Sequence, residues 1–415
     1  MEIKTGNAGW PIEDSIAELA SLADTADVEV VAEVVQRLDR PSPTSYLGRG
    51  KLEELVALRG ETGYDVAIFD DELSPRQQRN LEEALEVKVI DRTALILDIF
   101  ARHAHTREGQ LQVDLAQSEY LLPRLAGQWS HLERLGAGIG TRGPGEKKLE
   151  VDRRRIRERI SFLKKGLAKI DKERWVQRKQ RDTFFKIALV GYTNAGKSTL
   201  MNQLTNAGVK VASYLFSTLD PNTKIVSLHR NLKAFLTDTV GFIKNLPHQL
   251  VASFRATLSE IKEADLVLHV VDASIEDIIP KMTAVNETLK EISAQDKPML
   301  IVFNKIDRIF EDEIIKRLRR TYPDSVFISS LTGTGIEELK NAIAEFIESH
   351  LVTKTFNIPS ERQDLVGKLY QSGEVINRND QDDKTKLKVR GYPAVLLRAK
   401  KEIDFELRRL KRRTS

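Results

Sequence analysis

Cysteine is absent from the 415-residue sequence, and histidine is scarce, with seven residues. The absence of cysteine excludes disulfide bonds and metal sites built on thiolates. His103 and His105 have no further candidate ligands nearby at the spacing of a zinc site. We therefore expect that any metal ion bound by this chain prefers oxygen ligands, as Mg²⁺ does.

Long apolar runs are also missing, because no segment approaches the roughly 18 apolar residues of a membrane-spanning helix. The first ten residues lack the basic and then apolar segments of a signal peptide. We expect a cytoplasmic protein without a membrane span, acting as a monomer. Hydrophobic residues make up 41% and charged residues 30% of the chain, which is typical of a globular protein.

The net charge of +4 is small, but the charges are strongly segregated. Residues 1–35 carry eight acids and the single base Lys4, whereas residues 147–181 carry fifteen Lys and Arg and five Asp and Glu. Such a basic run is often only a solvated face, and it also suits contact with nucleic acid phosphates.

At roughly 100–200 residues per domain, the length predicts two to four domains, and the sequence patterns divide the chain into four. Alternating apolar and helical patches favour a small α/β domain at 1–107. Apolar residues then recur at spacings of three and four, which indicates a helical hairpin with a glycine-rich loop at 108–182. From Phe184 short β-branched strands alternate with helices, which is typical of a doubly wound parallel sheet, predicted at 183–350.

The remaining residues, 351–415, are expected to form a small C-terminal domain with strands at 368–376 and 387–398 and a basic tail. The predicted fold class is therefore α/β, with a doubly wound sheet as the main domain.

A phosphate-binding motif follows the strand predicted at 184–190. It fits G-x-x-x-x-G-K-S, and a helix begins near Thr199. Its residues are Gly191, Tyr192, Thr193, Asn194, Ala195, Gly196, Lys197 and Ser198. In such a P-loop the backbone N–H groups face the phosphates, the lysine reaches the β- and γ-phosphates, and the serine binds magnesium. The motif alone leaves ATP and GTP open.

A second strand ends at a carboxylate, where open α/β sheets bind ligands. This segment consists of Asp238, Thr239, Val240 and Gly241. Asp238 can hold a magnesium-bound water, and Gly241 offers a backbone N–H close to a γ-phosphate, so loss of that phosphate can release the following loop.

Two later strand ends carry residues suited to guanine. The strand at 298–303 ends at Asn304, Lys305, Ile306 and Asp307, and the next ends at Ser329, Ser330 and Leu331. A carboxylate that accepts hydrogen bonds from guanine N1–H and its 2-amino group selects guanine over adenine. The order of the four loops indicates a GTP and GDP site.

The chain resembles the HflX family, in the translation-factor class of P-loop GTPases. The resemblance rests on YLGRGK at 46–51, GTRGPGE at 140–146, FSTLDP at 216–221 and DTVGF at 238–242, and it weakens after residue 350. It implies slow GTP hydrolysis stimulated by ribosomes, with the large ribosomal subunit and its rRNA as partners. It also implies that the protein splits or rescues stalled ribosomes under stress.

By the same resemblance, switch I comprises Phe216, Ser217, Thr218, Leu219 and Asp220. The hydroxyl groups of Ser198 and Thr218 would bind Mg²⁺, and Lys197, Thr218 and Gly241 would act in catalysis. The residues alone would favour Thr218 as an ordinary strand residue. The chain departs from the family at Lys147 and Lys148 and at Ser330 of the base loop.

Phe242 stands where many GTPases carry a glutamine that orients the attacking water, and a phenyl ring forms no such hydrogen bond. We therefore expect slow unassisted hydrolysis. Resemblance to potassium-activated GTPases implies that Asn194 helps to hold K⁺ beside the phosphates. The alternative is that Asn194 only caps the P-loop turn.

The glycine-rich segment at 136–145 contains G-x-G-x-x-G, but a predicted helix precedes it, which excludes a dinucleotide fingerprint. It is either an RNA phosphate surface or a solvated linker. Two other functions stay open for the whole chain: an RNA-remodelling ATPase with a nucleotide site in the N-terminal domain, and a nucleotide-locked RNA-binding scaffold. A tRNA-modifying GTPase is disfavoured, because that family uses a C-terminal cysteine.

Overall fold

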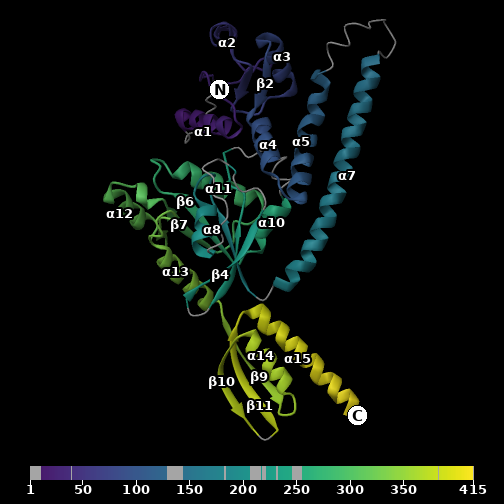
Figure 1. The fold of residues 1–415 in the computed structure, drawn as a ribbon, viewed down its shortest axis with the longest axis vertical. Coiled ribbons are helices and arrows are strands. Elements are labelled where there is room, and N and C mark those ends of the chain that lie inside the picture. Colours follow the sequence, from purple (N-terminus) through teal and green to yellow (C-terminus); the bar gives the residue numbers. More distant parts are fainter. Residues whose placement is uncertain are drawn as a thin grey trace.

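The structure of the protein is a computed structural model. The structure describes residues 11–38, 40–128, 144–181, 184–205, 216, 221–229, 232–244, 255–381 and 383–414. The molecule is elongated, with an N-terminal domain, a central domain and a C-terminal domain in sequence along its length (Figure 1). Within the described ranges, no helix has the length and apolar character needed to cross a membrane.

The N-terminal domain packs helices around a two-stranded parallel sheet. Its elements are α1 (Ile12–Thr25), α2 (Arg49–Thr62), β1 (Val66–Phe69), α3 (Pro75–Leu85), β2 (Lys88–Asp91) and α4 (Arg92–His103). Helix α3 begins where it does because Ser74 and Gln77 form a reciprocal capping box and Pro75 occupies the first helical position. The apolar residues at 28–35 form neither a helix nor a strand.

Helices α5 (Arg107–Gln128) and α7 (Pro144–Arg181) pack against each other as the predicted hairpin. Figure 1 shows α7 running alongside the central and N-terminal domains. Ion pairs between Arg159 and Asp114 and between Lys164 and Glu119 join the two helices. Most of the glycine-rich segment, 136–143, lies outside the described residues.

The central domain is a six-stranded sheet of order β4-β5-β3-β6-β7-β8, in which only β4 is antiparallel to its neighbour. Its strands are β3 (Phe185–Val190), β4 (Asn222–Ser227), β5 (Lys233–Asp238), β6 (Leu266–Asp272), β7 (Met299–Asn304) and β8 (Val326–Phe327). Its helices are α8 (Lys197–Thr205), α10 (Arg255–Glu263), α11 (Ile279–Glu291), α12 (Asp312–Thr321) and α13 (Ile336–Ser349).

Alternate residues of the central strands face opposite layers of this domain. From β3, Ala188 and Val190 join a core with α10 and α11, whereas Ile187 and Leu189 join a core with α8 and α13. Helices therefore cover both faces of the sheet, which confirms the predicted doubly wound fold.

The C-terminal domain is a three-stranded antiparallel sheet of order β10-β11-β9 packed against two helices. Its elements are β9 (Val352–Pro359), α14 (Gln363–Ser372), β10 (Glu374–Asp380), β11 (Lys384–Gly391) and α15 (Pro393–Thr414).

Each of the two strands predicted in this domain, at 368–376 and 387–398, is a strand over only part of its predicted range. Residues 368–372 belong to α14, because Leu365, Val366 and Leu369 form one apolar helical face that packs on the sheet. Residues 393–398 belong to α15, which begins at Pro393, since a residue without an N–H group suits the first turn of a helix.

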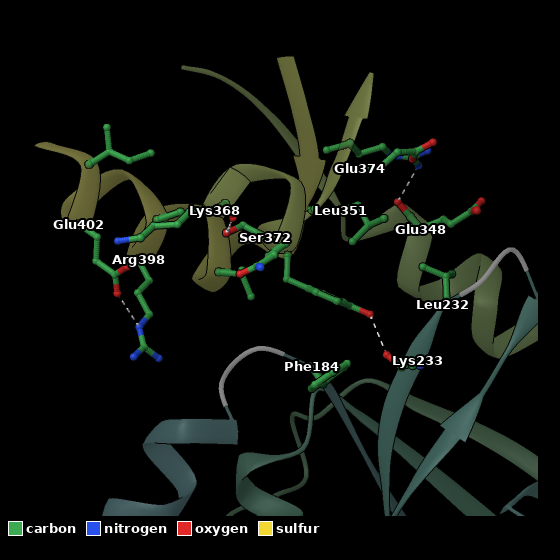
Figure 2. A pocket seen from close by; sticks show the side chains of 18 residues that line it. Phe184, Leu232, Lys233, Glu348, Leu351, Lys368, Ser372, Glu374, Arg398 and Glu402 are labelled. Atoms are coloured by element: carbon green, nitrogen blue, oxygen red, sulfur yellow. Dashed lines mark hydrogen bonds and ion pairs between the residues drawn. The ribbon is translucent and has the colours of Figure 1, made fainter. Parts of the chain in front are cut away.

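A cavity of about 1090 Å³ lies between the central and C-terminal domains (Figure 2). Beside it, the Tyr392 hydroxyl donates a hydrogen bond to the Lys233 carbonyl at 3.3 Å, and the Tyr392 ring stacks on Phe185. The Arg390 guanidinium donates to the Glu348 carbonyl at 3.3 Å. None of the predicted nucleotide-site residues that the structure describes lines this cavity, so the cavity is separate from the phosphate-binding motif.

Candidate nucleotide-binding site

The P-loop connects β3 to α8 through two glycines that no other residue can replace without strain. Gly191 has φ +156°, and a Cβ there would lie 2.2 Å from the Val270 carbonyl oxygen. Gly196 has φ +90°, and a Cβ there would lie 2.3 Å from the Asn304 side-chain nitrogen. The loop can therefore lie against the neighbouring strand ends and direct its N–H groups toward a phosphate.

Lys197 begins α8 and is buried inside the loop. Its ammonium group donates hydrogen bonds to the carbonyl oxygens of Gly191, at 3.1 Å, and Tyr192, at 3.0 Å. Burial lowers the pKa of Lys197 to about 8, against the opposing effect of the nearby Asp238 carboxylate. A bound polyphosphate would provide the further negative charge that favours the ammonium form.

His269 of β6 is buried near Lys197. Burial, together with the charge of Lys197, lowers the pKa of His269 to about 4. Its imidazole is therefore neutral at pH 7 and adds no positive charge to the phosphate site.

Ser198 and Asp238 lie together at the end of the sheet. The Ser198 hydroxyl donates to Asp238 Oδ2 at 2.7 Å, and both side chains are buried. No cluster of three or more His, Cys, Asp or Glu residues suited to a metal occurs in the described part of the chain. A hydroxyl and a carboxylate fit Mg²⁺, which binds through few protein oxygens together with substrate phosphates.

The segment after Asp238 contacts the P-loop directly. Gly241 lies so close that a Cβ there would be 2.9 Å from Thr193 Cγ2 and 3.2 Å from the Lys197 ammonium nitrogen. The side chains of Thr239 and Val240 are buried, and the Thr239 hydroxyl donates to the Leu189 carbonyl at 2.6 Å. Only backbone groups of Thr239 and Val240 can therefore face a nucleotide.

Phe242 packs into the core and forms a short bridge with the P-loop. Its N–H donates to the Gly191 carbonyl at 3.1 Å, and its carbonyl accepts from the Thr193 N–H at 2.8 Å. The ring is 1% exposed, so the residue at this position does not orient a water molecule.

Asn304 holds the P-loop and the base loop together. Its side chain donates to the Ala195 carbonyl at 2.8 Å and accepts from the Ser330 N–H at 2.9 Å. Lys305 lies in the left-handed region and pairs with Asp272 at 2.7 Å. Asp307 is exposed, so its carboxylate is available to a base.

The remaining predicted site residues differ in their surroundings. Asn194 is exposed with φ +58°, and Thr199 is half-buried in the first turn of α8. Ser329 is buried and Leu331 is 70% exposed.

Phe216 is buried against Phe100 of α4, at 4.6 Å between ring centroids. The predicted switch residues Ser217, Thr218, Leu219 and Asp220 lie outside the described residues.

Sequence reasoning missed a buried polar network between the P-loop and the N-terminal domain. The Tyr192 hydroxyl donates to Glu18 of α1 at 2.7 Å and accepts from the Lys244 N–H at 2.8 Å. Glu18 also pairs at 2.8 Å with the buried Arg92. No sequence pattern links Glu18 to Tyr192, because 174 positions separate them and only tertiary packing brings them together.

The apolar core crosses the same interface. Leu22, Ile99 and Phe100 of the N-terminal domain belong to one cluster with Phe242 and Ile243 of the segment after β5. The N-terminal domain therefore packs directly on the loop next to the phosphate site.

The P-loop lies between a strand and a helix, with a carboxylate beside its serine, and two further loops meet at the carboxyl ends of neighbouring strands. These features define a P-loop GTPase. Comparison with known families gives four matches along the chain. "GTP-binding GTPase N-terminal" matches 13–101, "GTP-binding GTPase Middle Region" matches 103–181, "50S ribosome-binding GTPase" matches 186–305 and "HflX C-terminal domain" matches 314–394.

Curated relatives agree with these matches. The GTPase HflX of Lacrimispora saccharolytica is 49% identical over 340 residues, covering 81% of this chain and 80% of the relative. The GTPase HflX of Magnetococcus marinus is 44% identical, covering 94% and 90%. That of Escherichia coli is 44% identical, covering 86% and 85%. The chain belongs to the HflX family, it binds guanine nucleotide and it hydrolyses GTP, as the sequence predicted.

Solved structures include a GTP-binding protein from Sulfolobus solfataricus in complex with GDP. It is 26% identical, covers 83% of this chain and 96% of its own, and has a TM-score of 0.42.

Proposed function

We propose that this GTPase binds the large ribosomal subunit in its GTP-bound state and splits or rescues stalled ribosomes, and that hydrolysis allows release. One observation carries the proposal: the central domain matches the 50S ribosome-binding GTPase model over 186–305. The long basic helix α7, whose exposed side chains include Arg154, Arg155 and Arg157, supports contact with rRNA.

Within the site, the loop from Gly191 to Thr199 would hold the phosphates, and Asp307 with the 329–331 loop would hold the guanine base. Ser198 and Thr218 would be Mg²⁺ ligands, and Asp238 would accept from a metal-bound water. When bound, Mg²⁺ would neutralise charge on the β- and γ-phosphates. Lys197 and the Gly241 N–H would stabilise charge that develops on the γ-phosphate.

Potassium would bind beside the same phosphates through Asn194. The Asn194 side chain is exposed and forms no hydrogen bond within the described residues, which favours a ligand role over capping the loop. The buried Phe242 supports slow hydrolysis away from the ribosome, since no side chain at that position orients water. We further propose the domain limits 1–107, 108–182, 183–350 and 351–415.

Cosedimentation with purified ribosomal subunits tests the function. We expect the protein to sediment with large subunits when a non-hydrolysable GTP analogue is present and to stay in the supernatant with GDP. Ser198→Ala is the control, because loss of a magnesium ligand should abolish the nucleotide dependence without unfolding the protein. Equal sedimentation in both nucleotide states, or none in either, would refute the proposal.

A further inference from the structure

The C-terminal sheet has one covered face and one open face. Phe356, Ile358, Leu387 and Val389 face helices α14 and α15 and are buried. The alternate residues of the same strands are exposed on the other side. Figure 1 shows both helices on one side of this sheet.

A row of cations runs down the middle of the open face. Lys384, Lys386 and Lys388 alternate along β11, the central strand, and all three side chains are exposed. Alternate residues of a strand are about 7 Å apart, so the three charges form a line about 14 Å long. Arg390 continues the row but is engaged with the Glu348 carbonyl of the central domain.

Among the residues that the structure describes, no carboxylate lies directly across the strands from these three lysines. Lys386 lies opposite Asn357 on β9 and Asn379 on β10, and Lys388 lies opposite Thr355 and Asn377. Lys384 lies opposite Pro359. None of the three lysines forms an ion pair or a side-chain hydrogen bond with any residue that the structure describes.

Lysine, threonine and asparagine are among the side chains that contact phosphate and sugar in nucleic acid complexes. The cores of protein interfaces are instead depleted in lysine and enriched in aromatic residues and methionine. The lysine row and its cross-strand neighbours contain no aromatic residue and no methionine. The open face therefore suits a phosphate backbone better than a protein surface.

We propose that the open face of the C-terminal sheet, centred on Lys384, Lys386 and Lys388, is a second RNA-binding surface that contacts the phosphate backbone of ribosomal RNA without reading its sequence. This second surface would add to the proposed ribosome binding, and the inference rests on that proposed function for the identity of the RNA. The surface belongs to a different domain from helix α7, so the protein would contact RNA at two separate places.

The test uses full-length protein carrying Lys384→Ala, Lys386→Ala and Lys388→Ala together. Affinity for protein-free large-subunit rRNA is measured against salt concentration. Three lost phosphate contacts should reduce the slope of log affinity against log salt by about 2 to 3. The matched control is Lys368→Ala, Lys400→Ala and Lys401→Ala, which removes the same charge from helices α14 and α15. It should keep the wild-type slope.

Melting temperature and GTP affinity should stay at wild-type values in both variants, because all six lysines are exposed and none belongs to the nucleotide site. We call the protein with Lys384, Lys386 and Lys388 replaced the sheet variant. A wild-type salt slope in the sheet variant, or an equal decrease of the slope in the sheet variant and the control, overturns the inference. A defect seen with intact large subunits but not with protein-free rRNA also overturns it and identifies an acidic protein as the partner.

The two proposals fail in different ways. If the wild-type protein does not sediment with large subunits but the sheet variant still loses affinity for RNA, ribosome binding is wrong and the RNA surface stands. If wild type and sheet variant sediment alike in the GTP state and bind RNA alike at every salt concentration, the RNA surface is wrong and ribosome binding stands.

Discussion

Burial changes the chemistry of single residues in this site. Lys197 is enclosed by its own loop, and its ammonium group is stabilised by two backbone carbonyls and by the Asp238 carboxylate. These contacts do not fully replace lost hydration, so the pKa of Lys197 falls to about 8. Asp307, in contrast, is exposed and ready to accept hydrogen bonds.

The lowered pKa predicts a pH dependence of GTP binding. Below pH 8 the free protein already carries the ammonium group, so pH has little effect through this residue. As pH rises above about 8, Lys197 must regain a proton on binding, and affinity should fall by up to about tenfold per pH unit. Titration calorimetry between pH 7 and 9 measures the GTP affinity at each pH. Guanosine is the control, because it shares the base and lacks phosphates. A ratio of GTP affinity to guanosine affinity that stays constant between pH 7 and 9 would contradict the prediction.

Asp307→Asn should shift base preference from guanine toward xanthine. The new amide presents a donor toward the purine 2-position, where the guanine amino group is also a donor and the xanthine oxygen is an acceptor. We expect GTP affinity to fall by at least about 100-fold, as when a buried polar group is left unpaired. Competition binding with XTP measures the change. Asp312→Asn, an exposed acid at the start of α12, is the control. Unchanged GTP affinity in Asp307→Asn would contradict the base assignment.

At the scale of elements, the P-loop, the segment after β5 and helix α1 act as one packed unit. Phe242 is tied to the P-loop by two backbone hydrogen bonds, and Tyr192 links the P-loop to Glu18. Burial, together with the Glu18 carboxylate, raises the pKa of Tyr192, so its hydroxyl stays protonated and remains a donor. A change in the P-loop or in the segment after β5 would therefore act on α1 through these contacts.

Glu18→Gln should loosen helix α1. Arg92 would lose one of its two carboxylate partners and keep Asp70, so its charge would stay paired. Loss of one hydrogen bond to a charged group costs about 1.5 to 3 kcal/mol. Hydrogen exchange of the α1 amides should accelerate by more than about tenfold. Glu13→Gln on the exposed face of the same helix is the control. Similar hydrogen-exchange protection of the α1 amides in both variants would show that the Glu18–Arg92 pair contributes little to the packing of α1.

Sequence reasoning succeeded for elements whose signals are local. The P-loop, the Asp238 strand end and the hairpin helices each follow from short-range spacing, because backbone geometry and helix periodicity act over a few residues. It failed at 368–372 and 393–398, where packing of α14 and the start of α15 at Pro393 outweighed strand propensity. The inward direction of Thr239 and the pairing of Glu18 with Tyr192 depend on tertiary contacts, which no local pattern encodes.

At the scale of the whole molecule, basic residues are exposed on two separate parts of the fold. Helix α7 runs beside the central and N-terminal domains, and the lysine row of β11 lies in the C-terminal domain (Figure 1). The N-terminal domain packs on the loop next to the P-loop through a shared core. A change in the loop next to the P-loop would therefore act on the N-terminal domain through this shared core.

Replacing Arg153, Arg154 and Arg155 with Ala tests the hairpin. These arginines lie on α7. The ion pairs of Arg154 with Glu158 and of Arg155 with Asp152 are long, at 3.8 and 3.7 Å, so these two charges are available to phosphates. We expect the slope of log affinity for large subunits against log salt concentration to decrease in magnitude by about 2 to 3. The GTP affinity of the free protein should stay unchanged. Salt-dependent cosedimentation and nucleotide titration measure the two quantities separately.

Lys290→Ala, Lys316→Ala and Arg317→Ala together form the matched control, because they remove the same charge from α11 and α12 of the central domain. If the hairpin variant bound and split subunits like wild type at every salt concentration, α7 would be only a solvated basic face. Contact with RNA would then depend on the C-terminal sheet, and the lysine row would account for most of the salt dependence. If both variants weakened equally, general charge attraction would explain the effect, since screening acts on any cation near the RNA.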